Sequence, residues 1–334
     1  MQTRIEWVDI YKGFLIFLVV LGHAFQGIAA DHTIVTNVDY NYILYFKYLI
    51  YSFHMPAFFI AGGFFAYNLF AKLNIEYFLH RFRRLMQPYF VWGFITALFM
   101  QIASRFTNNG LGLKNFIYSP IKPFSVFWFL YVYFLIFIVQ SILTVIFKEK
   151  SNKVFFILAI FLFLINPLIP KIWVFKSIAT YMIYYALGLF TLTFVTKYQN
   201  FFSKVMTLIL WIVIFLILFE IYFIYVQKNN LQIVYYLNFL TAIAGSILFI
   251  NLSIIVSNWH NWFSNMNDSF GKYSMQIYVI HLLPLACTRI FLLRIVHLNN
   301  LWLVSGIITI ISLIFCGLII KISKNLHLTK ILFG

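Results

Sequence analysis

Three histidines carry the first chemical signal in this sequence, because each falls near the middle of a long apolar run. They are His23, His54 and His281. A polar side chain held within hydrocarbon costs several kcal/mol unless it is paired or functional. One such histidine is often structural, but three on different runs predict a polar cavity inside a helical bundle. Histidine is the natural general base near neutral pH, so this cavity suits acid–base chemistry.

The first apolar run adds two charged residues close to His23. Lys12 and His23 are eleven residues apart, which at about 100° and 1.5 Å per residue places them on one helix face with a rise of about 16 Å. Asp9 precedes Lys12 by one turn, so the two side chains are expected to pair. The alternative is a lysine that extends to the membrane surface, together with a histidine that only bonds a neighbouring helix.

Two further runs contain polar residues in patterns that suit a cavity. In the second run His54 is followed by Pro56, which frees a backbone carbonyl, so His54 either lines the cavity or only satisfies that carbonyl. In the ninth run Ser274, Tyr278 and His281 lie at i, i+4 and i+7 and form one polar stripe. Its alternative is a tyrosine–histidine pair that joins two helices.

The segment before the third run is strongly basic. Arg81 and Arg84 lie at i and i+3, so a helix presents both guanidinium groups on one face, an arrangement that suits a phosphate group. From the residues alone, a basic anchor for anionic lipid is the favoured interpretation. Tyr89 follows directly after Pro88 at the start of the run. Trp128 lies near the outer end of the fourth run, at its start in the sequence, where an interfacial aromatic belt is the alternative to a cavity residue.

The composition indicates which elements must position these residues. Hydrophobic residues make up 63% of the 334 residues and charged residues only 10%, with a mean hydropathy of +0.92. Runs of about twenty apolar residues match the thickness of a bilayer, and inside lipid each must be helical. We therefore predict an all-α polytopic integral membrane bundle, one domain over residues 1–334. About ten spans are expected, near 10–30, 43–69, 88–104, 124–147, 154–169, 174–196, 204–226, 231–257, 272–293 and 300–322.

The formal net charge of +16 reflects basic residues in the loops between spans, so nucleic-acid binding is not expected. Fifteen of the 24 Lys and Arg residues fall on the side that would hold both termini. This bias predicts a protein of the cytoplasmic membrane with its N- and C-termini in the cytoplasm. The two cysteines, Cys287 and Cys316, lie within apolar runs and give neither a disulfide framework nor a metal-ligand spacing.

The ordered set of motifs resembles the membrane-bound acyltransferase 3 family, and within it the short polysaccharide O-acetyltransferases related to fucose 4-O-acetylase. The resemblance covers nearly the whole chain. It rests on Trp7-Val8-Asp9 with Lys12-Gly13 and Gly22-His23, on Ser52-Phe53-His54-Met55-Pro56-Ala57-Phe58-Phe59, on Arg81-Phe82-Arg83-Arg84 with Pro88-Tyr89, on Trp128-Phe129-Leu130, and on Gly271, Ser274, Ile277-Tyr278 and His281.

The resemblance implies an enzyme with ten core spans that takes acyl-CoA, most often acetyl-CoA, and acylates sugar hydroxyls of surface polymers or lipid-linked precursors. His23 matches the essential histidine of the family's basic-residue–x10–histidine motif, with Lys12 where arginine is common. Arg81 and Arg84 match a motif implicated in acyl-CoA binding, and Tyr89 is expected to belong to the same donor-binding site. The implied partners are acyl-CoA, a sugar or polysaccharide acceptor, membrane lipid and polysaccharide-synthesis proteins. No metal and no SGNH hydrolase domain are expected.

The resulting hypothesis makes His23 either the general base on the acceptor hydroxyl or an acyl relay. Asp9 and Lys12 would fix the charge at the cavity mouth. His54, Tyr278 and His281 would orient His23 or stabilise the oxyanion. Three alternatives stay open: a transporter or flippase for a polysaccharide or lipid-linked sugar, a zinc site built from the three histidines, and a structural scaffold.

Overall fold

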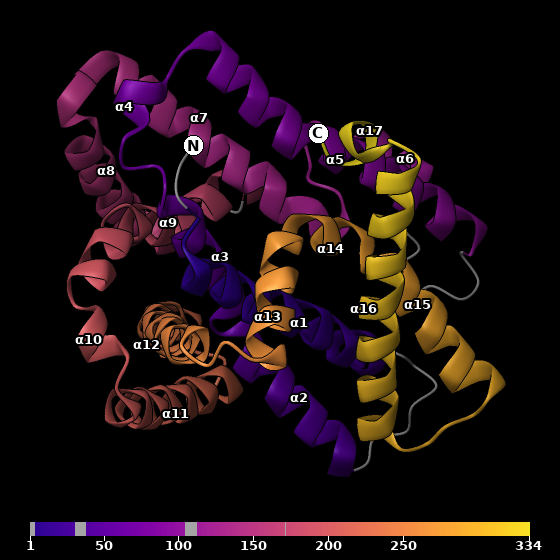
Figure 1. Cartoon of the computed structure of the whole chain (residues 1–334). Coiled ribbons are helices and arrows are strands. Elements are labelled where there is room, and N and C mark those ends of the chain that lie inside the picture. Colours follow the sequence, from indigo (N-terminus) through magenta and orange to yellow (C-terminus); the bar gives the residue numbers. More distant parts are fainter. Residues whose placement is uncertain (1–3, 31–37, 104–111, 171) are drawn as a thin grey trace. The chain divides into compact units, whose positions relative to one another are not determined.

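The computed structural model describes residues 4–30, 38–103, 112–170 and 172–334, and these residues are mostly helical (Figure 1). No strand occurs in these ranges. Within them, eight helices are long and apolar enough to cross a membrane, or nine if a bent pair in the ninth predicted span is one crossing. The predicted all-α polytopic bundle is therefore confirmed.

Each of the ten predicted spans coincides with helical structure, but the count by length and composition is lower. The reason is that residues Ser125–Leu168 pass as one candidate of 44 residues. At 1.5 Å per residue a straight helix of that length would extend about 66 Å, about twice the hydrocarbon core. The chain turns at Lys148, whose φ is 50°. The two predicted spans therefore correspond to separate helices, α7 (Trp128–Phe147) and α8 (Ser151–Ile165).

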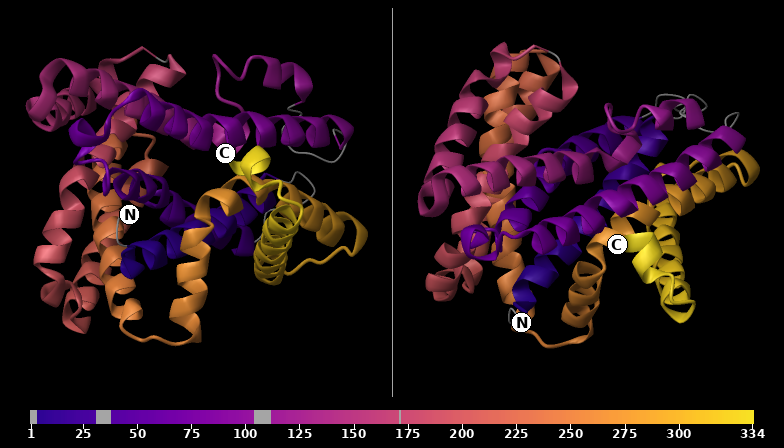
Figure 2. Two further views of the ribbon diagram at one scale, coloured as in Figure 1. Left: turned by 45° about the horizontal axis from the view of Figure 1, so that its top comes forward. Right: turned by 90° about the horizontal axis from the view of Figure 1, so that it is seen from above.

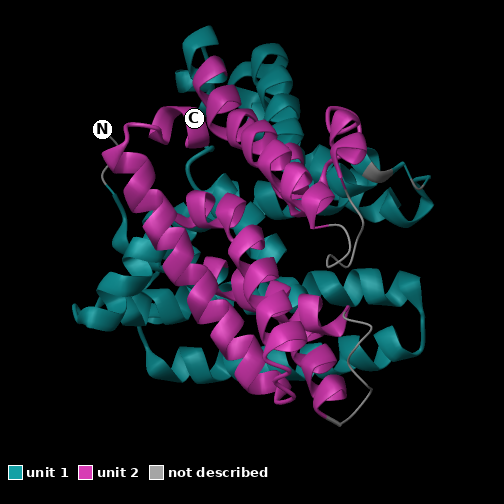
Figure 3. Cartoon of the chain, turned by 90° about the vertical axis from the view of Figure 1, so that its right-hand side faces the viewer, with its two compact units in different colours: residues 1–15, 51–78, 132–272 teal, residues 16–50, 79–131, 273–334 magenta. Residues whose placement is uncertain are grey.

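The chain forms two compact units, drawn in different colours in Figure 3. Unit 1 contains Met1–Leu15, Tyr51–Phe78 and Val132–Lys272, and unit 2 contains Ile16–Ile50, Leu79–Tyr131 and Tyr273–Gly334. The first helix, α1 (Glu6–Ala29), is continuous and contributes its first turns to unit 1 and the remainder to unit 2. Asp9 and Lys12 thus belong to unit 1, and His23 belongs to unit 2.

Unit 1 is built mainly from seven longer helices besides the start of α1. Helices α11 (Val205–Gln227) and α12 (Leu231–Ser257) lie side by side in both views of Figure 2, and α8 and α3 (His54–Gly63) each pack against α9 (Trp173–Lys197). Short turns η2 (Lys148–Lys150), η3 (Asn166–Leu168), α4 (Leu69–Lys72) and α10 (Gln199–Phe202) connect longer elements. The long elements are α3 (His54–Gly63), α8, α9 (Trp173–Lys197), α11 (Val205–Gln227), α12 (Leu231–Ser257) and α13 (Trp262–Lys272), with most of α7.

Glycines bring the backbones of α3 and α9 into contact. A Cβ added at Gly63 would lie 2.2 Å from the carbonyl oxygen of Tyr185, and one added at Gly188 would lie 2.2 Å from that of Ile60. Each glycine therefore faces the main chain of the opposite helix. Small residues allow this close approach, which is a common way of packing helices in membranes.

The second predicted span is broken into α2 (Val38–Tyr51) and α3, with Ser52 and Phe53 between them. Pro56 explains the break, because it lacks an N–H and its ring disfavours a helical hydrogen bond to the carbonyl of Ser52. The side-chain amide of Asn238 donates a hydrogen bond to that carbonyl at 3.1 Å. The freed carbonyl is thus satisfied by α12.

Unit 2 holds most of α5 (Ile75–Ile102), which begins well before the predicted span at residue 88. The Asn74 side chain accepts a hydrogen bond from the backbone N–H of Tyr77 at 2.8 Å and so caps the first turn. The other elements of unit 2 are α2, α6 (Leu113–Ile117), η1 (Ser125–Phe127), α14 (Ser274–Ile280), α15 (Leu282–Ile290), the π-helical turn η4 (Phe291–Ile295), α16 (Leu301–Asn325) and α17 (Thr329–Phe333).

The ninth predicted span, 272–293, is interrupted at His281, where α14 and α15 meet at an angle of 44°. Pro284 has no N–H to donate to the carbonyl of Ile280, which accounts for a bend at this level. Ser312 on α16 donates a hydrogen bond to the carbonyl of His281 at 3.0 Å. The break therefore places an imidazole at a point where the helix is bent and α16 supports its backbone.

Candidate active site

The charged group at the start of α1 is centred on Asp9, which is 4% exposed. Its Oδ2 lies 2.5 Å from Nε of Arg4, and its Oδ1 lies 2.6 Å from Nζ of Lys12. The predicted pairing of Asp9 with Lys12 is present in unit 1, and Arg4 is an additional partner that sequence reasoning missed. The Arg4 side chain is 58% exposed and that of Lys12 is 28% exposed, so the lysine pair is the better shielded.

Two glycines hold α13 against this part of α1. A Cβ at Gly271 would lie 1.7 Å from the carbonyl oxygen of Asp9, and a Cβ at Gly13 would lie 2.1 Å from the carbonyl oxygen of Asn267. Both distances are far below van der Waals contact, so neither position has room for a side chain. The first residue of the Gly271–Ser274 motif thus has a structural role: it lets α13 touch the backbone of Asp9.

Two of the three predicted histidines meet in unit 2. The imidazole ring of His23 on α1 lies against that of His281, with ring centroids 5.2 Å apart and an interplanar angle of 32°. This separation is within the range of direct ring contact. His281 is completely buried, and His23 is partly exposed. Residues far apart in the sequence therefore form a paired imidazole site.

The surroundings of His281 hold its ring in a defined orientation. Its Nδ1 lies 2.6 Å from the carbonyl oxygen of Tyr278, and the Tyr278 hydroxyl donates a hydrogen bond to the carbonyl of Val126. The Tyr278 ring also packs edge to face on Phe129, with centroids 5.6 Å apart. The Trp128-Phe129-Leu130 motif is therefore brought to Tyr278 through Phe129, the neighbour of Trp128.

Other predicted cavity residues lie elsewhere. His54, 2% exposed, belongs to unit 1, where its ring packs on that of Tyr51 with centroids 4.9 Å apart. Ser274 is the first residue of α14 and is partly buried. Because α14 ends before His281, the predicted stripe is not one continuous helix face. Ser274 and Tyr278 share α14, and His281 sits at the bend.

The basic segment forms the first turns of α5, as the i, i+3 spacing predicts. Arg81 is partly buried and Arg84 is exposed, with the exposed Arg83 between them. Tyr89, two turns further along, is fully buried. Its hydroxyl donates to the carbonyl of Ser119 at 2.8 Å and accepts from the backbone N–H of Phe124 at 3.2 Å. The phenol of Tyr89 thus joins α5 to the segment that precedes α7.

Helix α5 also binds α17 in unit 2. The side-chain amide of Gln87 donates to the carbonyls of Lys330 and Ile331 at 2.5 and 2.8 Å, and the indole N–H of Trp92 donates to the carbonyl of Leu332 at 3.0 Å. Three consecutive carbonyls are therefore bound by side chains of α5. Sequence reasoning did not assign Gln87 or Trp92 any role, because their partners are more than two hundred residues away.

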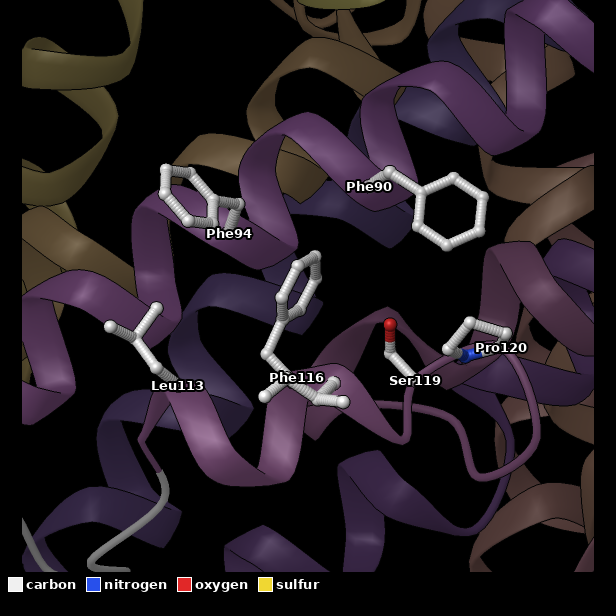
Figure 4. Close-up of a pocket in the computed structure, with 7 residues that line it drawn as sticks. Phe90, Phe94, Leu113, Phe116, Ser119 and Pro120 are labelled. Carbon is white, nitrogen blue, oxygen red and sulfur yellow. The ribbon is translucent and has the colours of Figure 1, made fainter.

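Unit 2 also contains an apolar pocket of about 430 Å³ between α5 and α6 (Figure 4). Figure 4 shows the rings of Phe90 and Phe94 on one side and that of Phe116 on the other. None of the predicted site residues lines it, and Ser119 is the polar residue of its wall. The wall carries no titratable side chain, so the pocket has no group that can move a proton.

Arg289 is a buried cation that sequence reasoning treated only as a topology signal. It is 4% exposed, and its Nη1 donates to the carbonyl of Gly27 at 3.2 Å. A Cβ at Gly27 would lie 3.2 Å from Cδ of Arg289, so the glycine makes room for the arginine side chain. The signal was available, since Arg289 falls within the predicted span 272–293 and a buried charge in a span is rarely incidental.

The residues that the structure describes contain no group of three or more His, Cys, Asp or Glu side chains that could hold a metal ion. The alternative of a zinc site built from His23, His54 and His281 therefore has no geometric support. An imidazole can itself take part in proton transfer or nucleophilic catalysis.

A family model described as an acyltransferase domain matches residues 5–321 of the chain. The match covers nearly the whole sequence, and the chain therefore belongs to the acyltransferase 3 family. The comparisons with curated proteins and with solved structures gave no match. A helical, polytopic membrane protein with acyltransferase activity is thus the class that fold and family define together.

Proposed function

We propose that this protein is a membrane O-acyltransferase that moves an acetyl group from acetyl-CoA to a hydroxyl of a cell-surface polysaccharide or lipid-linked sugar. The contact between His23 and His281 carries the proposal, because it places two imidazoles side by side in a chain of an acyltransferase family. Acyl transfer to a hydroxyl needs a base for the hydroxyl proton, and an imidazole supplies one near neutral pH.

His23 is the reacting imidazole in this proposal. In one route it removes the proton of the acceptor hydroxyl, which attacks the thioester directly. In the other it attacks the thioester itself and passes the acetyl group to the acceptor as an acyl-histidine. In the direct route, general-base assistance contributes about 10²–10⁴ to the rate. Tyr278 holds the partner imidazole through its carbonyl, and we assign Trp128 and Ser274 to the acceptor side of the site.

Arg81 and Arg84 are proposed to bind the phosphates of the donor. They share one face at the beginning of α5, and guanidinium groups bind phosphate oxygens with paired hydrogen bonds. Tyr89 does not touch the donor in this proposal. Its hydroxyl is already bonded to two backbone groups, so it positions α5. The basic segment would face the cytoplasm, the source of acetyl-CoA, with both termini on that side of the cytoplasmic membrane.

In unit 1, we propose that Asp9 and Lys12 fix a cation near the start of α1, the helix whose later turns carry His23. Asp9 accepts from both cations and so holds the lysine in place. Membrane lipid surrounds the spans, and polysaccharide-synthesis proteins would supply the acceptor.

The test uses purified protein, acetyl-CoA labelled in the acetyl group and membranes that carry the acceptor. We expect His23→Ala to abolish transfer of label. The matched control is His260→Asn, at an exposed position with φ of 45° where asparagine is well tolerated. Full transfer by His23→Ala would remove the central assignment. Movement of a lipid-linked sugar across vesicles without consumption of acetyl-CoA would favour a transporter instead.

A further inference from the structure

The hydrogen bonds of His281 define which of its ring nitrogens carries the proton. Nδ1 of His281 lies 2.6 Å from the carbonyl oxygen of Tyr278. A carbonyl oxygen only accepts, so Nδ1 must carry the hydrogen and donate it. In the neutral ring Nε2 is then the nitrogen with a lone pair. A neutral His281 with this tautomer accepts a proton at Nε2 and cannot donate a hydrogen bond there to an oxyanion.

Nε2 of His281 is buried and has no hydrogen-bond partner within the described part of the chain. Buried polar atoms are nearly always bonded, so an unsatisfied one requires an explanation. The other polar groups of His281 have partners. Its Nδ1 bonds to the carbonyl oxygen of Tyr278, and its backbone carbonyl accepts from the hydroxyl of Ser312. The unsatisfied atom is therefore the one that a reaction would use.

Two aromatic rings of the described chain face this imidazole. His23 approaches from α1 with its centroid 5.2 Å away, and the Tyr278 ring lies 6.0 Å away on the preceding turn. The Tyr278 hydroxyl is already donated to the carbonyl of Val126. Among these neighbours, His23 is thus the group that can exchange a proton with Nε2.

We propose that His281 is the proton-relay partner of His23: it accepts at Nε2 the proton that His23 must release from its non-reacting nitrogen. This inference rests on the proposed acyl transfer and assigns a residue to its proton step. His281 acts through His23, so it is a positioning and relay residue that does not itself touch the substrates.

The step balances as follows in the direct route. The O–H bond of the acceptor breaks, and its proton moves to the reacting nitrogen of His23. The proton on the other nitrogen of His23 moves to Nε2 of His281, which becomes an imidazolium. The acceptor oxygen bonds the acyl carbon, the C–S bond breaks, and the CoA thiolate recovers one proton through the same pair. In the acyl-histidine route the same N–H proton leaves His23 when the other nitrogen bonds the acyl carbon.

The decisive variant is His281→Asn. The asparagine side-chain amide can still donate a hydrogen bond to the Tyr278 carbonyl, but it has no atom equivalent to Nε2. The variant therefore keeps the structural hydrogen bond and removes only the proton acceptor. We expect kcat to fall about 10²-fold with the KM for acetyl-CoA and the midpoint of thermal unfolding unchanged. A kcat within threefold of the parent protein would overturn the relay.

A second measurement excludes a purely structural effect. In His281→Gly, added imidazoles of increasing basicity are expected to restore turnover in proportion to their basicity, as proton acceptance requires. If the restored rate did not depend on the basicity of the added imidazole, the proposal would be contradicted. The same holds if no imidazole restored turnover in a variant that still binds acetyl-CoA. The two variants distinguish failure of the proposed function from failure of the relay. An active His23→Ala variant removes the proposed function, whereas an inactive His23→Ala variant beside an active His281→Asn variant removes only the relay.

Discussion

Gly271 lies directly against the backbone carbonyl of Asp9, so closely that a Cβ at the glycine would fall 1.7 Å from the carbonyl oxygen. This contact joins α13 to the first turns of α1. Asp9 in turn holds Arg4 and Lys12. The position of this charged group therefore depends on the missing side chain of Gly271 on α13.

Gly271→Ala is expected to destabilise the protein by about 1–3 kcal/mol, the usual cost of overpacking a close contact. Activity should fall as well, because α1 must shift away from α13. Thermal unfolding in detergent measures the first effect. Gly306→Ala is the matched control, since nothing lies within 4 Å of a Cβ there, and it should leave stability unchanged or slightly raised. Equal stability of the two variants would contradict the contact.

Asp9→Asn and Arg4→Ala should differ in effect. The amide removes the charge that both cations share and should cost about 1–3 kcal/mol, the range for hydrogen bonds that involve a charged group. Arg4 is mostly exposed, so its loss should cost less than about 1 kcal/mol, as for other surface pairs. Unfolding midpoints and turnover of the two variants provide the measurement. A larger loss for Arg4→Ala would show that Arg4, not Lys12, is the principal partner.

Arg81→Ala should raise the KM for acetyl-CoA with little change in kcat, because it removes a contact to a part of the donor that does not react. One charge-assisted hydrogen bond is worth about 1.5–3 kcal/mol, which corresponds to roughly a tenfold to hundredfold rise in KM. Arg83→Ala, in the same turn but off the Arg81–Arg84 face, is the control and should change KM little. Initial rates against donor concentration distinguish the two, and equal effects would point to general surface charge.

Gln87→Leu should release α17 from α5, because the side chain donates to two of its carbonyls. Hydrogen exchange of the segment 326–333 is the measurement, and faster exchange is expected. Lys330→Met is the control, since the backbone carbonyl of residue 330, not its side chain, accepts the bond. If exchange stayed slow in Gln87→Leu, then Trp92 alone would hold the segment.

The fold class follows from the sequence because lipid leaves the backbone few choices, and runs of apolar residues therefore mark helices. Helix starts are harder to predict. Helix α5 begins at Ile75 rather than near residue 88, since its first turns are polar and are capped by Asn74. An apolar-run criterion cannot detect such turns. The bend at His281 was likewise hidden inside an apolar run, although Pro284 marks it.

The sequence predicted contacts within one helix of the proposed site better than contacts between helices. Spacing along one helix predicted that Asp9 and Lys12 pair, because residues three apart on a helix are neighbours. The contact of His23 with His281 depends on how α1 packs against the α14–α15 bend, which no local pattern encodes. The same is true of Arg289, whose place is set by the missing side chain of Gly27.

The backbone contact between Gly63 and Gly188 limits how unit 1 can move. Sliding α3 along α9 would bring Phe59 or Ile60, which share a helix face with Gly63, toward the backbone of α9, where even a methyl group cannot fit beside Gly188. Sliding of α3 along α9 is therefore sterically opposed at this interface, and we expect the two helices to move together during turnover. A cross-link between these two helices would leave turnover intact.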